Sequence, residues 1–271
     1  MIEILKSILL GIVEGITEWL PISSTGHMIL VNEFINNAGF TNSDLYIYVI
    51  QLGAILAVVT MYFKKLNPFS PSKNKLERAD TWQMWFKVIV ACIPAAVIGL
   101  LFDDYMDKIE TWYVVALTLL IYGIAFIVVE RRKKLPVVTA MNSLTYKTAI
   151  LVGLFQVLSI IPGTSRSGAT ILGAIIIGCS RELAAEFSFF LAIPVMFGVS
   201  FLKIITNLDL FSTQNLLVLI TGMLVAYVVS LISMKFLVEY VKKHDFRFFG
   251  YYRIVLALIV FAYFGISALI A

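Results

Sequence analysis

The sequence predicts an all-α polytopic membrane protein with six transmembrane helices and two re-entrant helix hairpins, arranged as an inverted-topology repeat. Three observations predict this fold. The first is composition: of 271 residues, 60% are hydrophobic and only 14% are charged, and the mean hydropathy is +0.93. A soluble domain carries about 25% charged residues, so this chain has too few charges to cover a water-facing surface. The second and third observations are six long apolar stretches and two apolar regions interrupted by polar segments.

The six apolar stretches are long enough to cross a bilayer, which takes about 20 residues per helix. They are residues 44–63, 82–102, 111–130, 182–206, 214–238 and 250–271. The chain is therefore treated as a single membrane domain, 1–271. Its two cysteines, Cys92 and Cys179, lie in separate apolar runs without metal-ligand spacing, which indicates packing residues.

Two further apolar regions do not qualify as simple spans. Residues 1–36 are interrupted by the polar segment Glu14–His27, and residues 145–178 by Pro162–Gly168. Proline, glycine and clustered hydroxyls stop a helix, and a serine or threonine then caps the next one. Non-helical backbone survives at membrane depth only where protein or a water-filled cavity surrounds it. Both regions are therefore predicted to be re-entrant hairpins; the alternative is two broken helices that span the membrane.

The charges of the loops test this topology. If neither hairpin crosses, the loops at 64–81, 131–147 and 239–249 fall on one side. These loops hold Lys64, Lys65, Lys73, Lys75, Arg78, Arg131, Arg132, Lys133, Lys134, Lys147, Lys242, Lys243 and Arg247. The other side holds Lys6 and Lys108 with Asp44, Asp103, Asp104, Asp107, Glu110 and Asp209. The positive-inside rule makes the basic side cytoplasmic, so both termini are predicted to lie outside.

The two interrupted regions resemble each other. Aligning residue 11 with residue 153, an offset of 142, pairs chemically similar residues at the breaks. The pairs are Gly11 with Gly153, Glu14 with Gln156, Ser23 with Ser165, Thr25 with Ser167, Gly26 with Gly168 and Ile29-Leu30 with Ile171-Leu172. Each half, about 1–142 and 143–271, then crosses three times, so the second half is inverted. Such repeats place broken helices from opposite sides at the membrane midplane, where the two tips are expected to meet.

Ionisable residues inside a membrane are functional candidates by default. Glu14 and Glu18 are four residues apart and share one helix face. Two adjacent carboxylates repel each other unless a cation or a shared proton relieves them, and Mg²⁺ or Ca²⁺ prefers oxygen ligands. Both glutamates are therefore candidate ligands of a divalent cation. The alternative is that one of them pairs with Arg166 as a structural ion pair.

The residues after the glutamates suit an anion. The run Ser23-Ser24-Thr25-Gly26-His27 offers hydroxyls and free amides at a helix N-terminus, which form an anion site. A serine near a histidine and carboxylates also suits an activated nucleophile. The alternative is that Ser23 and Ser24 only cap the helix and that His27 is a packing residue.

The second segment supplies the positive charge. Arg166 can bind phosphate oxygens in a bidentate manner, with hydroxyl donors on both sides of it in the chain. These donors are Thr164, Ser165 and Ser167, and glycines such as Gly163 let the backbone approach a ligand closely. The segment therefore predicts an anion-binding loop.

The two segments, Glu14–His27 and Pro162–Gly168, resemble those of the bacterial undecaprenyl-diphosphatase family, BacA/UppP, in order and spacing over essentially the whole chain. The resemblance implies an enzyme of the bacterial cytoplasmic membrane that removes one phosphate from undecaprenyl diphosphate. This regenerates the lipid carrier for peptidoglycan and is linked to bacitracin resistance. It further implies metal or proton handling by Glu14 and Glu18, and Ser24 or His27 as nucleophile or base. A metal-activated water is a third candidate nucleophile, and Ser165 and Arg166 would bind the diphosphate.

Access and partners follow from the same topology. Because the hairpin with the two glutamates enters from outside, the head group is expected to come from the outer leaflet. The expected partners are a polyprenyl diphosphate lipid and the membrane, with no nucleic acid, and a homodimer is an additional candidate. The strongest rival function is a transporter or flippase of a polyprenyl phosphate lipid. A second rival is a lipid phosphatase that forms a phosphohistidine, which needs two histidines. Besides His27 the chain has only His244, which lies in a basic loop far from the first hairpin tip, so this class is a poor match.

Overall fold

The computed structural model describes residues 1–35, 39–132 and 134–270, and for 103–107 and 267–270 it describes the backbone alone. The predicted basic residue Lys133 and the side chains of Asp103, Asp104 and Asp107 therefore lie outside the described part. Within that part the chain is helical, without strands beyond an isolated bridge. The helices are α1 Ile2–Thr17, α2 Ser24–Phe34, α3 Asp44–Met61, α4 Phe63–Leu66, α5 Lys75–Ile109, α6 Trp112–Arg131, α7 Tyr146–Val157, α8 Arg166–Ile177, α9 Arg181–Thr206, α10 Thr213–Lys243 and α11 Arg247–Ile270, with short 3₁₀ turns η1 Phe40–Asn42, η2 Leu158–Ile160 and η3 Leu208–Leu210.

Six of these helices are long and apolar enough to cross a membrane, which confirms the predicted number. They are α3, α5 as far as Phe102, α6, α9, α10 and α11, with mean hydropathies from 1.8 to 2.5. The predicted boundaries differ most at three places. Helix α5 begins at Lys75 rather than at residue 82 and ends at Ile109 rather than at residue 102, and α10 ends at Lys243 rather than at residue 238. Polar and charged residues continue both helices beyond their apolar cores, and hydropathy alone does not detect such extensions.

The helices break where the sequence predicts. Helix α1 has 16 residues, α2 has 11, and α7 and α8 have 12 each, which corresponds to about 16–24 Å per helix at 1.5 Å per residue. Each is shorter than the roughly 30 Å of a hydrocarbon core. Ser23 caps α2 by accepting from the amide of Gly26, and Ser165 caps α8 by accepting from Gly168. Both capping serines have φ of 74°, an uncommon value for a residue with a side chain.

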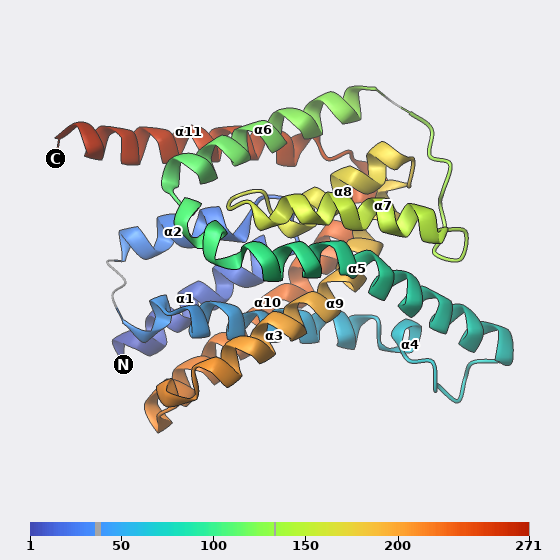
Figure 1. Ribbon diagram of the computed structural model, residues 1–271, viewed down its shortest axis with the longest axis horizontal. Coiled ribbons are helices and arrows are strands. Elements are labelled where there is room, and N and C mark those ends of the chain that lie inside the picture. Colours follow the sequence, from blue (N-terminus) through green and yellow to red (C-terminus); the bar gives the residue numbers. More distant parts are fainter. Residues whose placement is uncertain (36–38, 133, 271) are drawn as a thin grey trace.

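The two interrupted regions enter the molecule from opposite ends (Figure 1). Helices α1 and α2, in blue, turn back near the centre, and so do α7 and α8, in yellow-green. Helix α1 packs on α10, and α7 packs on α5. The start of α1 and the end of α11 lie at the same end of the molecule, opposite α4 (Figure 1). The breaks therefore lie inside the bundle rather than at its surface.

Close contact between α6 and α11 fixes the last helix against the bundle. A Cβ at Gly123 would lie 2.8 Å from the carbonyl oxygen of Gly250, and a Cβ at Gly250 would lie 2.7 Å from that of Gly123. Only glycine lets the two backbones approach so closely, as is common where membrane helices cross. This contact places the following turn of α11 beside the two breaks.

Candidate active site

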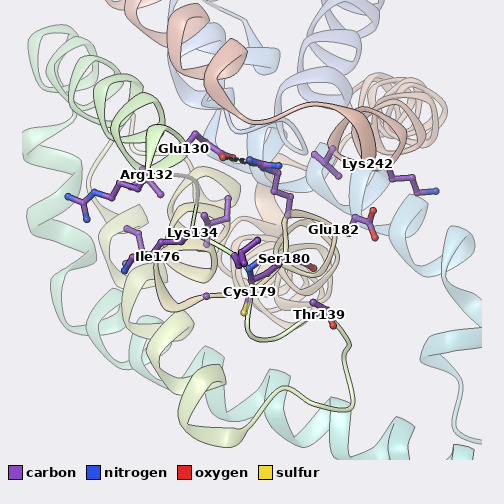
Figure 2. A pocket seen from close by; sticks show the side chains of 16 residues that line it. Glu130, Arg132, Lys134, Thr139, Ile176, Cys179, Ser180, Glu182 and Lys242 are labelled. Atoms are coloured by element: carbon purple, nitrogen blue, oxygen red, sulfur yellow. Dashed lines mark hydrogen bonds and ion pairs between the residues drawn. The ribbon is translucent and has the colours of Figure 1, made fainter.

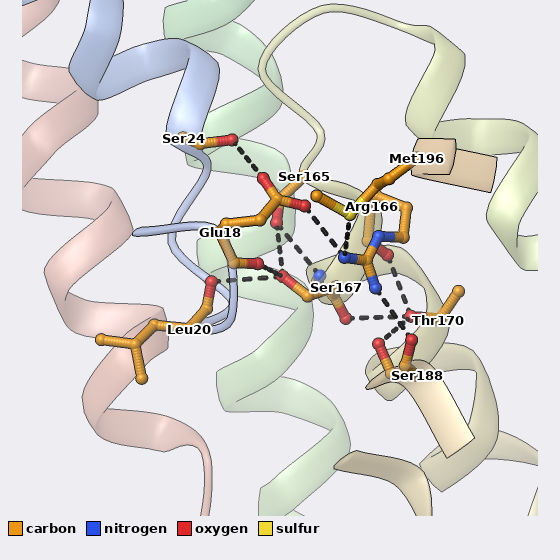
Figure 3. A network of polar contacts seen from close by, with 10 residues as sticks. Glu18, Leu20, Ser24, Ser165, Arg166, Ser167, Thr170, Ser188 and Met196 are labelled. Atoms are coloured by element: carbon orange, nitrogen blue, oxygen red, sulfur yellow. Dashed lines mark hydrogen bonds and ion pairs between the residues drawn. The ribbon is translucent and has the colours of Figure 1, made fainter. Parts of the chain in front are cut away.

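The two polar segments meet inside the bundle (Figure 3). The hydroxyl of Ser167 donates to the backbone carbonyls of Glu18, at 2.9 Å, and Leu20, at 3.2 Å. The guanidinium of Arg166 donates to Oε1 of Glu18 at 2.9 Å. Segments about 150 residues apart in the sequence thus form one polar cluster, joined by side chains predicted to belong to one site.

Arg166 is held on several sides. Its Nη1 donates to the backbone carbonyl of Ser188 at 2.8 Å, and its Nη2 lies 3.5 Å from the sulfur of Met196. The guanidinium also lies over the ring of Trp19, 5.5 Å from the ring centroid. The side chains of Arg166 and Glu18 are only 11% and 9% exposed. The ion pair weighed in the sequence analysis is therefore present, and it holds the guanidinium of Arg166 in a fixed, partly desolvated position in the cluster.

Glu18 joins this charge to a serine. Its Oε2 accepts a hydrogen bond of 2.8 Å from the hydroxyl of Ser24, while its Oε1 accepts from Arg166. Ser24 is half-buried, so its hydroxyl is not sealed inside the protein. A hydroxyl that donates to a buried carboxylate has its general base within proton-transfer distance. The arrangement Ser24–Glu18–Arg166 is therefore one that can activate an oxygen nucleophile beside a guanidinium group.

The serines of the two segments differ in what their hydroxyls bind. Ser23 and Ser165 have the capping role that was the alternative interpretation, because their side chains accept from the amides of Gly26 and Gly168 at 3.3 and 3.1 Å. Ser24 instead donates to Glu18. Thr25 follows in the first turn of α2 and is half-buried. Of the two adjacent serines, Ser23 caps the helix, and Ser24 has a hydroxyl hydrogen-bonded to a carboxylate.

His27 has other partners than the sequence suggested. Its Nδ1 lies 2.7 Å from the carbonyl oxygen of Ser23, and its Nε2 lies 2.6 Å from the hydroxyl of Tyr252 in α11. The rings of His27 and Tyr252 are stacked, with their centroids 5.6 Å apart and an angle of 8° between their planes. Within the described residues, no hydrogen bond joins His27 to Ser24 or to either glutamate. The histidine thus connects the first segment to α11 and lies one turn beyond Ser24.

Glu14 is buried one helical turn before Glu18, with 1% of its surface exposed. Its Oε1 has no hydrogen-bond partner among the described residues, and its carboxyl group lies within electrostatic range of Glu18 and Arg166. Gln156, which aligns with Glu14 in the second half, is equally buried, and both polar atoms of its side chain lack partners in the described part. Because unpartnered buried polar atoms are costly, the carboxyl group of Glu14 is suited to a proton or a ligand, and the amide of Gln156 to a ligand.

The second segment needs its glycine. Gly163 has φ of +82°, and a Cβ there would lie 2.7 Å from the Cα of Val115 and would also contact Thr118. The hydroxyl of Thr118 donates to the carbonyl of Pro162 at 2.8 Å. The loop is therefore pressed against α6, which fixes the backbone just before Thr164. The hydroxyl oxygen of Thr164 is buried and has no partner in the described part of the chain.

Two neighbouring residues of the site, Tyr252 and Arg253, escape prediction from the sequence. Arg253 is fully buried, and its guanidinium donates to backbone carbonyls of both segments. In the sequence it stands near the start of an apolar stretch, where a basic residue ordinarily marks the membrane interface. The sequence feature that could have identified Arg253 is its position inside the predicted span 250–271 rather than in a flanking loop.

A separate pocket of about 380 Å³ lies at the junction of α6, α8, α9 and α10 (Figure 2). Its lining includes Glu130, Arg132, Lys134 and Lys242, and none of the predicted site residues. Here Arg181 binds Glu130 through two nitrogens, at 3.0 and 2.6 Å. This ion pair fastens the start of α9 to the end of α6, away from the Ser24–Glu18–Arg166 cluster.

Comparison with known proteins gives a consistent result. The family model described as "Bacitracin resistance protein BacA" matches residues 7–259. A protein of Enterococcus faecalis named undecaprenyl-diphosphatase is 58% identical over 265 residues, covering 95% of this chain and 96% of the relative. Proteins of the same name from Acetivibrio thermocellus and Streptococcus mutans are each 57% identical, over 97% and 96% of this chain and 98% and 96% of theirs. The chain belongs to the BacA family of bacitracin resistance proteins.

Proposed function

We propose that this chain is an integral membrane undecaprenyl-diphosphatase. It hydrolyses undecaprenyl diphosphate to undecaprenyl phosphate and inorganic phosphate, which recycles the lipid carrier for cell-wall synthesis and confers bacitracin resistance. The observation that carries the proposal is the bridge made by Glu18, which accepts from Ser24 at 2.8 Å and from Arg166 at 2.9 Å. Relatives more than half identical over nearly the full length carry the same activity in their names.

The geometry favours Ser24 as the nucleophile. Its oxygen attacks the terminal phosphorus while its proton passes to Glu18, and the bond to the bridging oxygen breaks, so that undecaprenyl phosphate leaves. Glu18 gives this proton to the departing undecaprenyl phosphate. A water molecule then attacks the phosphorus of the phosphoserine and passes a proton to Glu18, which returns it to the Ser24 oxygen as inorganic phosphate is released. His27 is the weaker candidate because both of its ring nitrogens already have partners, in Ser23 and Tyr252. Attack by a metal-activated water is the remaining candidate.

The diphosphate is bound where two helices begin. Helices α2 and α8 start at Ser24 and Arg166, next to the ion pair, and helix N-termini favour anions. Arg166 provides the charge for the phosphate oxygens. Thr25 and Thr164 offer hydroxyls and Gly163 offers a backbone amide to the phosphate oxygens. Ser23, Ser165 and Ser167 hold the two loops in place around the head group through their own hydrogen bonds.

The architecture that supports this site is two re-entrant hairpins in an inverted repeat. Two observations support it besides the short helices of each hairpin. The capping serines, Ser23 and Ser165, share the same positive φ. The aligned glycines Gly11 and Gly153 each touch a long helix of the opposite half, with Cβ positions against Gly222 of α10 and Ala91 of α5. The two halves therefore use equivalent contacts.

The head group enters from the outer leaflet of the bacterial cytoplasmic membrane. Support comes from the basic loops, which the six-span topology gathers on one side, and from both ends of the chain lying at the opposite end of the molecule (Figure 1). With the basic side in the cytoplasm, α1 and α2 enter from outside and carry Glu14, Glu18 and Ser24 with them.

A divalent cation, Mg²⁺ or Ca²⁺, fits the carboxylates in that one of their oxygens is available to bind it. Glu14 offers a buried oxygen without a partner in the described part, beside the carboxylate of Glu18. No three acidic, histidine or cysteine side chains cluster there among the described residues, so remaining ligands would be water or phosphate oxygens, as Mg²⁺ often prefers. When bound, the cation would neutralise charge on the diphosphate.

A phosphate-release assay tests the function and the cation together. The purified chain in detergent, given undecaprenyl diphosphate, should release inorganic phosphate, and a chelator should abolish the release if a cation is required. E18Q, S24A and R166A should each lose the activity, while S143A, in an exposed loop, should retain it. Movement of a polyprenyl phosphate lipid across a vesicle membrane without phosphate release would overturn the proposal in favour of a transporter or flippase.

A further inference from the structure

Arg253 is a buried charge without an acidic partner. It lies in α11 with 0% of its surface exposed, and no acidic side chain pairs with it in the part of the chain that the structure describes. A buried charge ordinarily needs a counter-ion or a full set of hydrogen bonds. Here the acceptors are backbone carbonyls, and the ring of Tyr122 covers the guanidinium at 5.3 Å.

The carbonyls belong to both halves of the site. Nη1 donates to Pro21 in the first break at 3.3 Å, and Nη2 donates to Gly163 and Thr164 in the second break at 3.0 and 2.9 Å. Nε lies 3.5 Å from the carbonyl of Leu119 in α6. The breaks leave their carbonyls outside any helix, where each needs another donor at membrane depth. One planar guanidinium satisfies carbonyls of both breaks at once.

These carbonyls stand close to the reacting groups in the chain. Pro21 precedes Ser24 by three residues, and Thr164 precedes Arg166 by two. Gly168 lies against the same guanidinium, since a Cβ there would be 3.1 Å from Nη1. The distance between the serine of one hairpin and the arginine of the other therefore depends on the side chain that joins their backbones.

We propose that Arg253 is a positioning residue for the phosphatase reaction, which connects the two hairpin tips so that Ser24 and Arg166 meet the same phosphate. This inference rests on the proposed function. Arg253 touches neither Ser24 nor the Glu18–Arg166 ion pair by hydrogen bonds among the described residues, so it acts through the backbone. Its rigid fork of donors reaches acceptors in both tips, which a single ammonium group cannot do.

The test is a comparison of R253K with R181K. Both replace a buried or half-buried arginine that makes several hydrogen bonds, but Arg181 binds Glu130 away from the site. R253K should lower kcat for undecaprenyl diphosphate by about 10²-fold, because misplacement by about 1 Å costs that much. KM should change by less than about 3-fold, since Arg166 and the binding hydroxyls remain. R181K should lower the melting temperature while kcat stays near that of the wild type.

Each result has one meaning. If the wild type releases phosphate and R253K keeps its kcat, or raises KM with kcat unchanged, the positioning role is wrong. An equal loss of kcat in R253K and R181K, in step with melting temperature, also contradicts it. If the wild type itself releases no phosphate, the proposed function fails instead. R253Q, which retains a planar donor pair without charge, should recover more kcat than R253M, with kcat expressed per folded protein so that a loss of folding does not count as a loss of positioning.

Discussion

Glu18 divides its two oxygens between a hydroxyl and a guanidinium. Oε2 accepts a hydrogen bond from the hydroxyl of Ser24, and Oε1 accepts one from the guanidinium of Arg166 in the other half of the chain. Under the proposed function, this carboxylate is both the base for the nucleophile and the link that sets the phosphate-binding residue beside it. Within the described structure, the neighbouring Ser23 makes no such contact with Glu18, because its side chain caps α2.

If Ser24 makes the attack, the enzyme passes through a phosphoserine. After rapid acid quenching of the wild type with undecaprenyl diphosphate, phosphate should be found on Ser24. Mass spectrometry of the digested protein measures this directly. S24A should lower kcat by on the order of 10²–10⁴-fold. Phosphate on His27 under the same quench, or an unmodified protein with full turnover, would exclude Ser24.

At the scale of the helix, each break depends on a serine in an unusual conformation. Ser23 and Ser165 both cap a helix with φ of 74°, where a residue with a Cβ is strained. The side chain is retained because its oxygen satisfies an amide that the break would otherwise leave unpaired. At each of these serines, the cap therefore stabilises the fold and the backbone strain destabilises it.

Alanine and glycine at Ser23 separate the two effects. S23A loses the cap and keeps the strain, whereas S23G loses the cap and relieves it, so S23G should be more stable than S23A. Ser43 caps α3 with an ordinary φ of −77° and is the matched control. The difference between the alanine and glycine variants should be larger at Ser23 by about 1–2 kcal/mol. Thermal unfolding in detergent measures it, and equal differences at both positions would contradict the role of strain.

The crossing of α6 and α11 is equally demanding. G123A places a methyl group 2.8 Å from the carbonyl of Gly250, so the helices must separate, at a cost of about 1–3 kcal/mol. G198A, in α9, meets nothing within 4 Å and is the control that should unfold no earlier than the wild type. Because α11 carries Arg253, G123A should also lower kcat. Unfolding temperature and phosphate release, measured side by side, check both expectations.

For the molecule as a whole, the topology can be tested from outside the cell. In a background without Cys92 and Cys179, a cysteine at exposed Asp209 should react with an impermeant maleimide in intact cells. A cysteine at exposed Asn74 should react only after the cells are made permeable. The positive-inside rule predicts this pattern from the basic loops. The reverse pattern would mean that the hairpin with Glu18 and Ser24 enters from the cytoplasm.

Much of this molecule could be predicted from local sequence. The spans follow from apolar length, and the breaks follow from Pro21, Pro162 and the serines beside them, because these residues act on their own backbone. The partners of His27 and the role of Arg253 could not be predicted in this way. Both depend on α11 lying across the two breaks, which is decided by contacts such as Gly123 with Gly250 and has no periodic signature.

The docking of α1 on α10 has a consequence for synthesis. Ser7 donates to the carbonyl of Val218, which is 211 residues further along the chain. A ribosome adds about 5–20 residues per second, so about 10–40 s pass between the two residues. During that interval the hairpin with Glu14 and Glu18 is in the membrane before the helix that will hold it exists. The segment that carries Glu14 and Glu18 is therefore made first and gains this contact only after α10 has been made.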